Sequence, residues 1–136
     1  MSPEPTERNK TVAWTALRIA AGSTYFSHGA AKLFGWFGAE THVDYMSRFG
    51  IAGVIETFLG GLIIIGLFTR IAAFICSGEM AVAYFWMHWG GSGQAWWWEN
   101  HGEIVMVYSF LWLFFAAWGA GPVSLDARRR GMAESG

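Results

Sequence analysis

Four long apolar stretches constrain this chain more than any other feature of its sequence. They cover about residues 12–37, 51–68, 71–89 and 104–120. Each approaches the roughly 20 residues that an α-helix needs to cross the hydrocarbon core of a bilayer. A spanning helix satisfies its own backbone hydrogen bonds, and the stretches lack the short alternating pattern of barrel strands. The sequence therefore predicts an all-α integral membrane protein, a bundle of four transmembrane helices in contact with lipid.

Composition favours the same class. The chain is 54% hydrophobic and 14% charged, whereas soluble domains carry about 25% charged residues. The net charge of −1 gives no reason to expect nucleic-acid binding. The single cysteine, Cys76, excludes an internal disulfide, a CxxC redox pair and a Cys-rich metal site. Cys76 stands in an apolar run, which favours a buried, inert thiol.

The predicted organisation has a polar segment at 1–11, a four-helix domain at 12–121 and a basic tail at 122–136. Residues 1–10 lack the apolar core and cleavage site of a signal peptide, so we expect the first apolar stretch to remain as an anchor. One side of the predicted membrane collects nearly all the basic residues outside the spans, namely Arg8, Lys10, Arg70 and Arg128 to Arg130, against Arg48 on the other side. The positive-inside rule then places both termini in the cytoplasm.

The connections carry further predictions. The loop at 38–50 could hold a short surface helix, and Thr69-Arg70 reads as a tight link between the second and third helices, which would form an antiparallel hairpin. Three consecutive tryptophans at 96–98 fit an interfacial aromatic belt on the outer side. We expect the end of the tail to be mobile.

Charged and polar side chains lie within the predicted spans or at their edges: Arg18, His28, Lys32, Glu56, Glu79, His88 and Glu103. Charges at this depth cost free energy and usually face the bundle interior in pairs. In the first helix Arg18, Tyr25 and Lys32 recur every seven residues with Gly22 and Gly29 between them, so they share one stripe. The glycines would let a neighbouring helix approach closely, and Gly53, Glu56 and Gly60 repeat the pattern in the second helix.

Depth along the helices, at about 1.5 Å per residue, groups these side chains into two clusters. Arg18 and Glu79 form one predicted pair, and His28, Lys32, Glu56 and Glu103 form a second cluster nearer the outer side. Two interpretations stay open: an ion-pair network of Arg18, Glu79, Lys32 and Glu56 that only holds helices together, or a catalytic site built on His28, Lys32, Glu56 and Glu103.

The sequence assigns no functional role to two further histidines, and it predicts no metal site. We interpret His88 as an interfacial histidine without a role and place His101 in a wet loop. The candidate ligands His28, Glu56 and Glu103 lack the i, i+3 or i, i+4 spacing of helical metal sites, so no metal is predicted.

A set of ordered motifs resembles one known family. They are LRIAAG at 17–22, HGAAKLFG at 28–35, ETFLGG at 56–61, GLFTR at 66–70, EMAVA at 79–83, NHGE at 100–103 and GAGPVSLD at 119–126. In this order they are similar to the DoxX family and extend over nearly the whole chain. The resemblance implies a small multi-pass protein of the inner membrane. Some relatives are small subunits of a thiosulfate:quinone oxidoreductase, and others are membrane partners of detoxifying enzymes.

Three functional hypotheses follow. The protein could be a membrane subunit that anchors or completes a larger complex and could supply part of a quinone pocket, although the sequence identifies no cofactor. It could instead oxidise a small sulfur compound with a quinone, using Glu56 or Glu103 as proton carrier, His28 as relay, and Lys32 or Arg18 to stabilise an anion. The third is a small transporter or lipid-handling protein, since buried charges mark ion pathways. We favour the first, because the chain is small, shows no soluble domain and resembles a family whose relatives work in assemblies. The sequence also has no haem-attachment or Rossmann motif.

Overall fold

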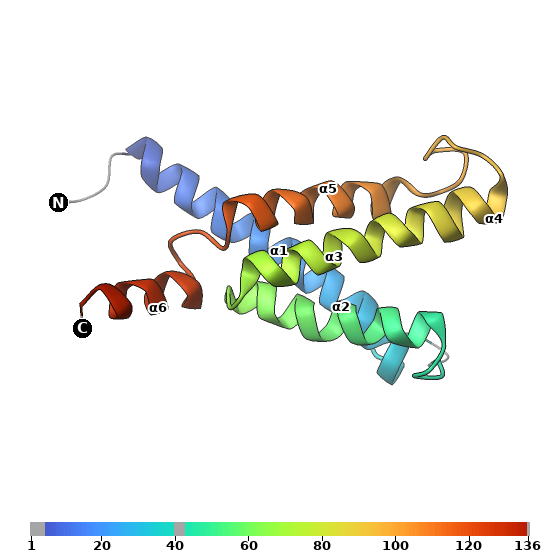
Figure 1. Cartoon of the computed structure of the whole chain (residues 1–136), viewed down its shortest axis with the longest axis horizontal. Helices are drawn as coiled ribbons and strands as arrows, with labels where there is room; N and C mark the ends of the chain where they lie inside the picture. Colours follow the sequence, from blue (N-terminus) through green and yellow to red (C-terminus); the bar gives the residue numbers. More distant parts are fainter. Residues whose placement is uncertain (1–4, 40–42, 136) are drawn as a thin grey trace. The chain divides into compact units, whose positions relative to one another are not determined.

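The computed structural model describes residues 5–39 and 43–135, and all regular structure in those residues is helical (Figure 1). The elements are α1 (Pro5–Phe34), α2 (Arg48–Ile65), α3 (Thr69–Ala83), the π-helix η1 (Tyr84–Trp89), α4 (Gly90–Ser92), α5 (Glu103–Trp118) and α6 (Leu125–Glu134). The all-α prediction is confirmed. The chain forms two compact units: α1, α2, Thr69 and α6 belong to the first, and the rest of α3 from Arg70 on, with η1, α4 and α5, belongs to the second.

Two helices in the described residues are long and apolar enough to cross a membrane. They are α2, with a mean hydropathy of 1.7, and the continuous helix Thr69–Ser92 formed by α3, η1 and α4, with a mean hydropathy of 1.2. The apolar helix α5 is shorter, at 16 residues. Spanning by α1 and α5, and the orientation of the chain, stay predictions.

Helix α1 begins earlier and ends earlier than the apolar stretch at 12–37. It starts at Pro5, so part of the predicted polar segment is helical; residues 1–4 lie outside the described residues. Proline suits a first helical turn, and Glu7 is favourable near the positive end of the helix dipole. The helix ends at Phe34, because Gly35 follows with a φ of +65° in the left-handed region.

The link between α2 and α3 lies before Thr69-Arg70, not at those two residues. Gly66 adopts the left-handed conformation with φ 70°, and the Leu67 N–H donates to the Leu62 carbonyl at 2.9 Å, which closes α2. Thr69 already starts α3. The predicted surface helix at 38–50 is also wrong for the described part of that loop, since 38–39 and 43–47 are not helical and Ser47 caps the start of α2.

Helices α1 and α2 pack antiparallel through their glycines. A Cβ atom added at Gly29 would lie 2.5 Å from the backbone nitrogen of Thr57, and one at Gly60 would lie 3.1 Å from the Cα atom of Phe26. Near the other end of the contact, a Cβ at Gly22 would lie 3.0 Å from Ile64. A side chain at Gly29 would overlap the neighbouring backbone, and one at Gly60 or Gly22 would need its neighbour to shift, so the predicted close approach along the glycine stripe is confirmed.

The tail forms a helix whose start is fastened to the turn after α2, and the mobility expected for the end of the tail stays a prediction. Ser124 caps α6 by accepting a hydrogen bond from the Ala127 N–H at 3.1 Å. The Asp126 carboxylate accepts from the N–H groups of Phe68 and Thr69 at 2.8 and 2.9 Å. The Asp126 N–H donates to the Gly66 carbonyl at 2.8 Å. Asp126 therefore satisfies backbone groups that the turn would otherwise leave unpaired.

In the second unit, α3 and α5 are joined by reciprocal serine contacts. The Ser77 hydroxyl donates to the Ser109 carbonyl at 2.8 Å, and the Ser109 hydroxyl donates to the Ser77 carbonyl at 3.1 Å. Arg70 Nε donates to the Ala116 carbonyl at 3.0 Å. The buried side chains of this unit include Cys76 and Trp112, so the interpretation of Cys76 as a buried thiol is confirmed.

Candidate functional site

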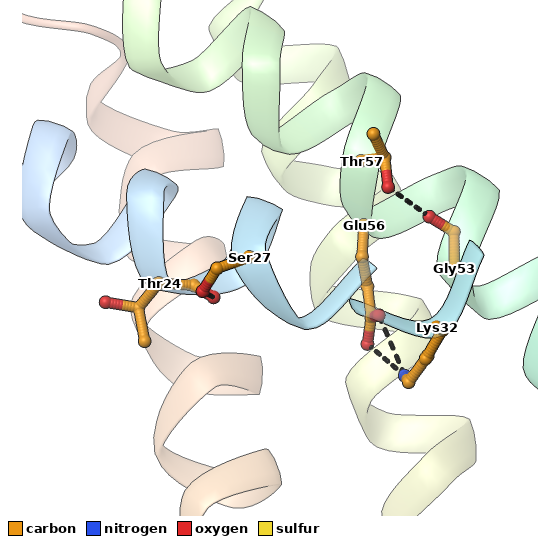
Figure 2. A network of polar contacts seen from close by, with 6 residues as sticks. All are labelled: Thr24, Ser27, Lys32, Gly53, Glu56 and Thr57. Carbon is orange, nitrogen blue, oxygen red and sulfur yellow. Dashed lines mark hydrogen bonds and ion pairs between the residues drawn. The ribbon is translucent and has the colours of Figure 1, made fainter. Parts of the chain in front are cut away.

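The ion pair between Lys32 and Glu56 is the centre of the candidate site (Figure 2). Lys32 Nζ donates to Oε1 and Oε2 of Glu56 at 2.7 and 2.8 Å. The Glu56 side chain is only 4% exposed, whereas the Lys32 side chain is 30% exposed. Lys32 comes from the last turn of α1, and Glu56 comes from the middle of α2. The pair that the sequence placed at matching depth is therefore brought together by the packing of these two helices.

Gly53 allows the Lys32 side chain to pass close to α2 and reach Glu56. A Cβ added at Gly53 would lie 3.2 Å from the Cβ of Lys32 and 3.0 Å from Leu33, so the lysine stem crosses α2 at this glycine. The carbonyl of Gly53 accepts a hydrogen bond from the Thr57 hydroxyl at 2.7 Å (Figure 2). The same figure shows the Ser27 hydroxyl donating to the Thr24 carbonyl at 2.7 Å in α1. These hydroxyl groups are satisfied within their own helices, and Lys32 and Glu56 provide the polar link between α1 and α2 that Figure 2 marks.

His28 belongs to the surroundings of this pair, but Glu103 is not placed there. His28 is exposed on α1 and is close enough to Glu56 for a Coulombic interaction. Glu103 opens α5 in the second unit and is exposed. Its membership of the cluster stays a prediction, because the two units are described separately.

Arg18 finds its partners in the backbone of the segment after α5. Its Nη1 donates to the Ala120 carbonyl, and its Nη2 donates to the Val123 carbonyl at 2.9 Å. The residue is 3% exposed. Its Nε is buried without a hydrogen-bond partner among the described residues, as is the Thr69 hydroxyl. The predicted pair of Arg18 with Glu79 joins the two units and stays a prediction.

The carbonyl partners of Arg18 were missed by the sequence analysis. The signal for them is the run of glycine and proline at 119–122, which ends a helix and leaves carbonyl groups that need donors.

A second polar network surrounds His88 in the second unit, where the sequence analysis assigned no role. His88 Nδ1 lies 2.9 Å from the carbonyl oxygen of Asn100. A carbonyl only accepts, so Nδ1 carries the proton, and in the neutral ring Nε2 is left as the acceptor. Asn100 is itself 5% exposed, donates to the Gln94 carbonyl at 2.9 Å and accepts from the Gly102 N–H at 2.8 Å. His88 is thus held by the loop before α5.

The residues that could hold a metal ion are sparse. Within residues 5–39 and 43–135, no group of three or more His, Cys, Asp or Glu side chains is arranged to bind one.

These features define a helical membrane protein with a buried ion pair on glycine-packed helices. The family model of DoxX matches residues 13–89, which is more than half of the chain. The chain therefore belongs to the DoxX family. An uncharacterized protein of Haemophilus influenzae is 42% identical over 119 residues, an alignment that covers 81% of this chain and 85% of that protein. No solved structure matches the chain. The matched residues include Arg18, Lys32 and Glu56 but not Glu103.

Proposed function

We propose that this protein lies in the inner membrane as a subunit that anchors or completes a larger membrane complex. The observation that supports it most directly is the engagement of its buried charges. Both oxygens of Glu56 accept from Lys32, and the pair lies where α1 and α2 approach at glycine distance. The two terminal nitrogens of the Arg18 guanidinium likewise donate to backbone carbonyls. Charges used in this way fix helices, which is what a scaffold subunit requires.

The helices also offer surface to a partner within the membrane. Phe58 on α2 is 66% exposed, and Phe74 on α3 and Phe110 on α5 are each 67% exposed. Such side chains can face lipid or the apolar face of another subunit, because both are equally apolar surroundings. The one cysteine, Cys76, is fully buried, so this chain brings no accessible thiol to a reaction.

The proposal is tested on protein extracted from its native membrane in mild detergent, with the mass of the particle measured by light scattering and by native mass spectrometry. We expect a second polypeptide in fixed ratio to this 15.1 kDa chain. A Glu56→Gln variant, which disturbs the α1–α2 contact, should lower that ratio, and Glu99→Gln on the exposed loop serves as the charge-matched control. A monomer or a homo-oligomer alone would contradict the proposal.

We also propose, as the second candidate, quinone-linked oxidation of a small sulfur compound at the Lys32–Glu56 pair. The specific observation is the uneven exposure of the pair: Glu56 is enclosed, whereas Lys32 and the neighbouring His28 are open. A quinone head group bound beside Lys32 would have an ammonium near its oxygen and a carboxylate and imidazole to pass protons. Quinone reduction with thiosulfate as donor, measured in membrane vesicles, distinguishes the two candidates. Equal rates for the wild type and Glu56→Gln would exclude this role.

The orientation of the chain belongs to the same proposal. The basic residues support four spans with both termini in the cytoplasm. Trypsin added to inside-out vesicles should then remove the end of α6, which carries Arg128 to Arg130. Cleavage at these residues in intact spheroplasts would show that the C-terminus lies on the outer side and would contradict the proposed orientation.

A further inference from the structure

Helix α6 is held at one end of a candidate membrane span. Its residue Asp126 bonds the backbone of Gly66, Phe68 and Thr69, in the turn that directly follows α2. Helix α2 is long and apolar enough to cross the bilayer and ends at Ile65. In a bilayer that α2 crosses, the start of α6 would lie at the depth where acyl chains give way to phosphate groups.

Phe68 fixes one arginine of α6 in this position. The guanidinium carbon of Arg129 lies 4.6 Å from the centre of the Phe68 ring. Phe68 itself has a φ of 50°, a conformation that bulky residues seldom adopt, and it is 50% exposed. A guanidinium stacked on a ring still presents its N–H groups at its edge, in the fork that fits phosphate oxygens. Arg129 is thus oriented and its hydrogen-bonding edge is available.

A shallow hollow, open on most sides, lies beside this arginine on one face of α6 and is lined by Asp126, Arg129, Arg130 and Ala133. The two arginines are exposed, so neither is buried against the rest of the first unit. The carboxylate of Asp126 is already engaged by two backbone N–H groups, which reduces its repulsion of an incoming anion. The hollow therefore contains two guanidinium groups, and its one carboxylate, that of Asp126, is already hydrogen-bonded to the backbone.

Apolar side chains surround the same end of the helix. Val123 is 57% exposed and Leu125 is 40% exposed, and Phe68 adds its ring. Exposed apolar groups next to arginines are typical of helices that lie in the membrane interface and contact anionic lipids. A free phosphate ion would use the arginines but not this apolar border.

We propose that Arg129 and Arg130 bind the phosphate of an anionic phospholipid, phosphatidylglycerol, in the hollow along this face of α6. The head-group glycerol, on the far side of the phosphate, lies against Ala133, and the acyl chains run in the other direction along the apolar border formed by Phe68, Val123 and Leu125. The site does not depend on the subunit function proposed above.

The test measures retention of phosphatidylglycerol against phosphatidylcholine by native mass spectrometry of the full-length protein. Arg130→Gln should lower retention of phosphatidylglycerol by roughly fivefold, the effect of one basic residue near an anionic surface. Arg128→Gln is the matched control, because it removes the same charge from the same helix outside the hollow. Equal losses for the two variants would overturn the proposal in favour of a diffuse attraction between charges.

Two further measurements cover the other outcomes. Ala133→Trp fills the hollow without changing charge and should also reduce the preference for phosphatidylglycerol, even where loss of an arginine disturbs folding. Inorganic phosphate and glycerol 3-phosphate are added as competitors. Full displacement of the lipid by either, at concentrations equal to that of the lipid, would show a site for free phosphate and would refute the lipid assignment. An unchanged lipid preference in Ala133→Trp would refute the hollow as its location.

Discussion

Gly29 sits at the tightest point of the contact between α1 and α2, and replacing it with alanine tests how that contact is built. The added Cβ would lie 2.5 Å from the backbone nitrogen of Thr57, 2.5 Å from its hydroxyl oxygen and 2.7 Å from the carbonyl oxygen of Gly53. Two of these atoms belong to the backbone, so rotation of a side chain cannot relieve the overlap. The helices must move apart by several tenths of an ångström.

The expected magnitude follows from two opposing effects. Alanine favours a helix over glycine by about 1 kcal/mol. Overpacking of a close contact costs about 1–3 kcal/mol, and a separation of 0.5–1 Å also forfeits a quarter to a half of the dispersion energy at the interface. Separation would further lengthen the Lys32–Glu56 contact, which now measures 2.7 Å. We expect a net loss of about 2 kcal/mol for Gly29→Ala.

Gly61→Ala is the matched control, because a Cβ at that position of α2 meets nothing within 4 Å. It should gain the helix propensity without the overlap and be slightly more stable than the wild type. Both variants are compared by reversible unfolding in mixed micelles, with helix content followed by circular dichroism. If Gly29→Ala proved as stable as Gly61→Ala, the close approach of the two helices would not exist in the folded protein.

Three further predictions concern single contacts. Lys32→Met alone should destabilise by roughly 3 kcal/mol, because the Glu56 carboxylate is left buried and unpaired; the double variant Lys32→Met, Glu56→Leu should recover part of this loss in the same unfolding assay, and additive losses would argue against the pair. Asp126→Ala should release α6 from the turn and speed its cleavage by trypsin in detergent, whereas an unchanged rate would mean that the carboxylate does not hold the helix. Thr69→Val should keep or slightly raise the unfolding free energy, since the buried hydroxyl has no partner among the described residues, and a loss above about 1 kcal/mol would reveal one.

The sequence predicts those parts of the site that follow from helical periodicity. Glycines seven residues apart on two apolar stretches specify one face on each helix, so the glycine contact follows from the sequence. Lys32 and Glu56 lie on those faces at matching depth, which leaves few other partners for either charge.

The parts that periodicity could not predict depend on irregular backbone. The carbonyl groups that accept from Arg18 belong to a non-helical segment, and any residue type carries a carbonyl. His88 depends on the carbonyl of Asn100 for the same reason. The early start of α1 was missed because a search for membrane spans selects apolar residues, whereas a polar stretch with good helix formers is equally able to be helical.

The distribution of partners for the charges of α1 has a consequence for how the protein is made. A basic residue near the centre of a span opposes insertion by about 2.5–3.5 kcal/mol. In α1 this cost falls on Arg18, and Lys32 in the last turn adds a smaller one. The counter-charge of Lys32 is synthesised 24 residues later, and the partners of Arg18 follow at separations of 102 and 105 residues. We therefore expect α1 to wait at the membrane surface until α2 emerges from the ribosome and to enter together with it. It should reach its final depth only after Ala120 and Val123 have emerged.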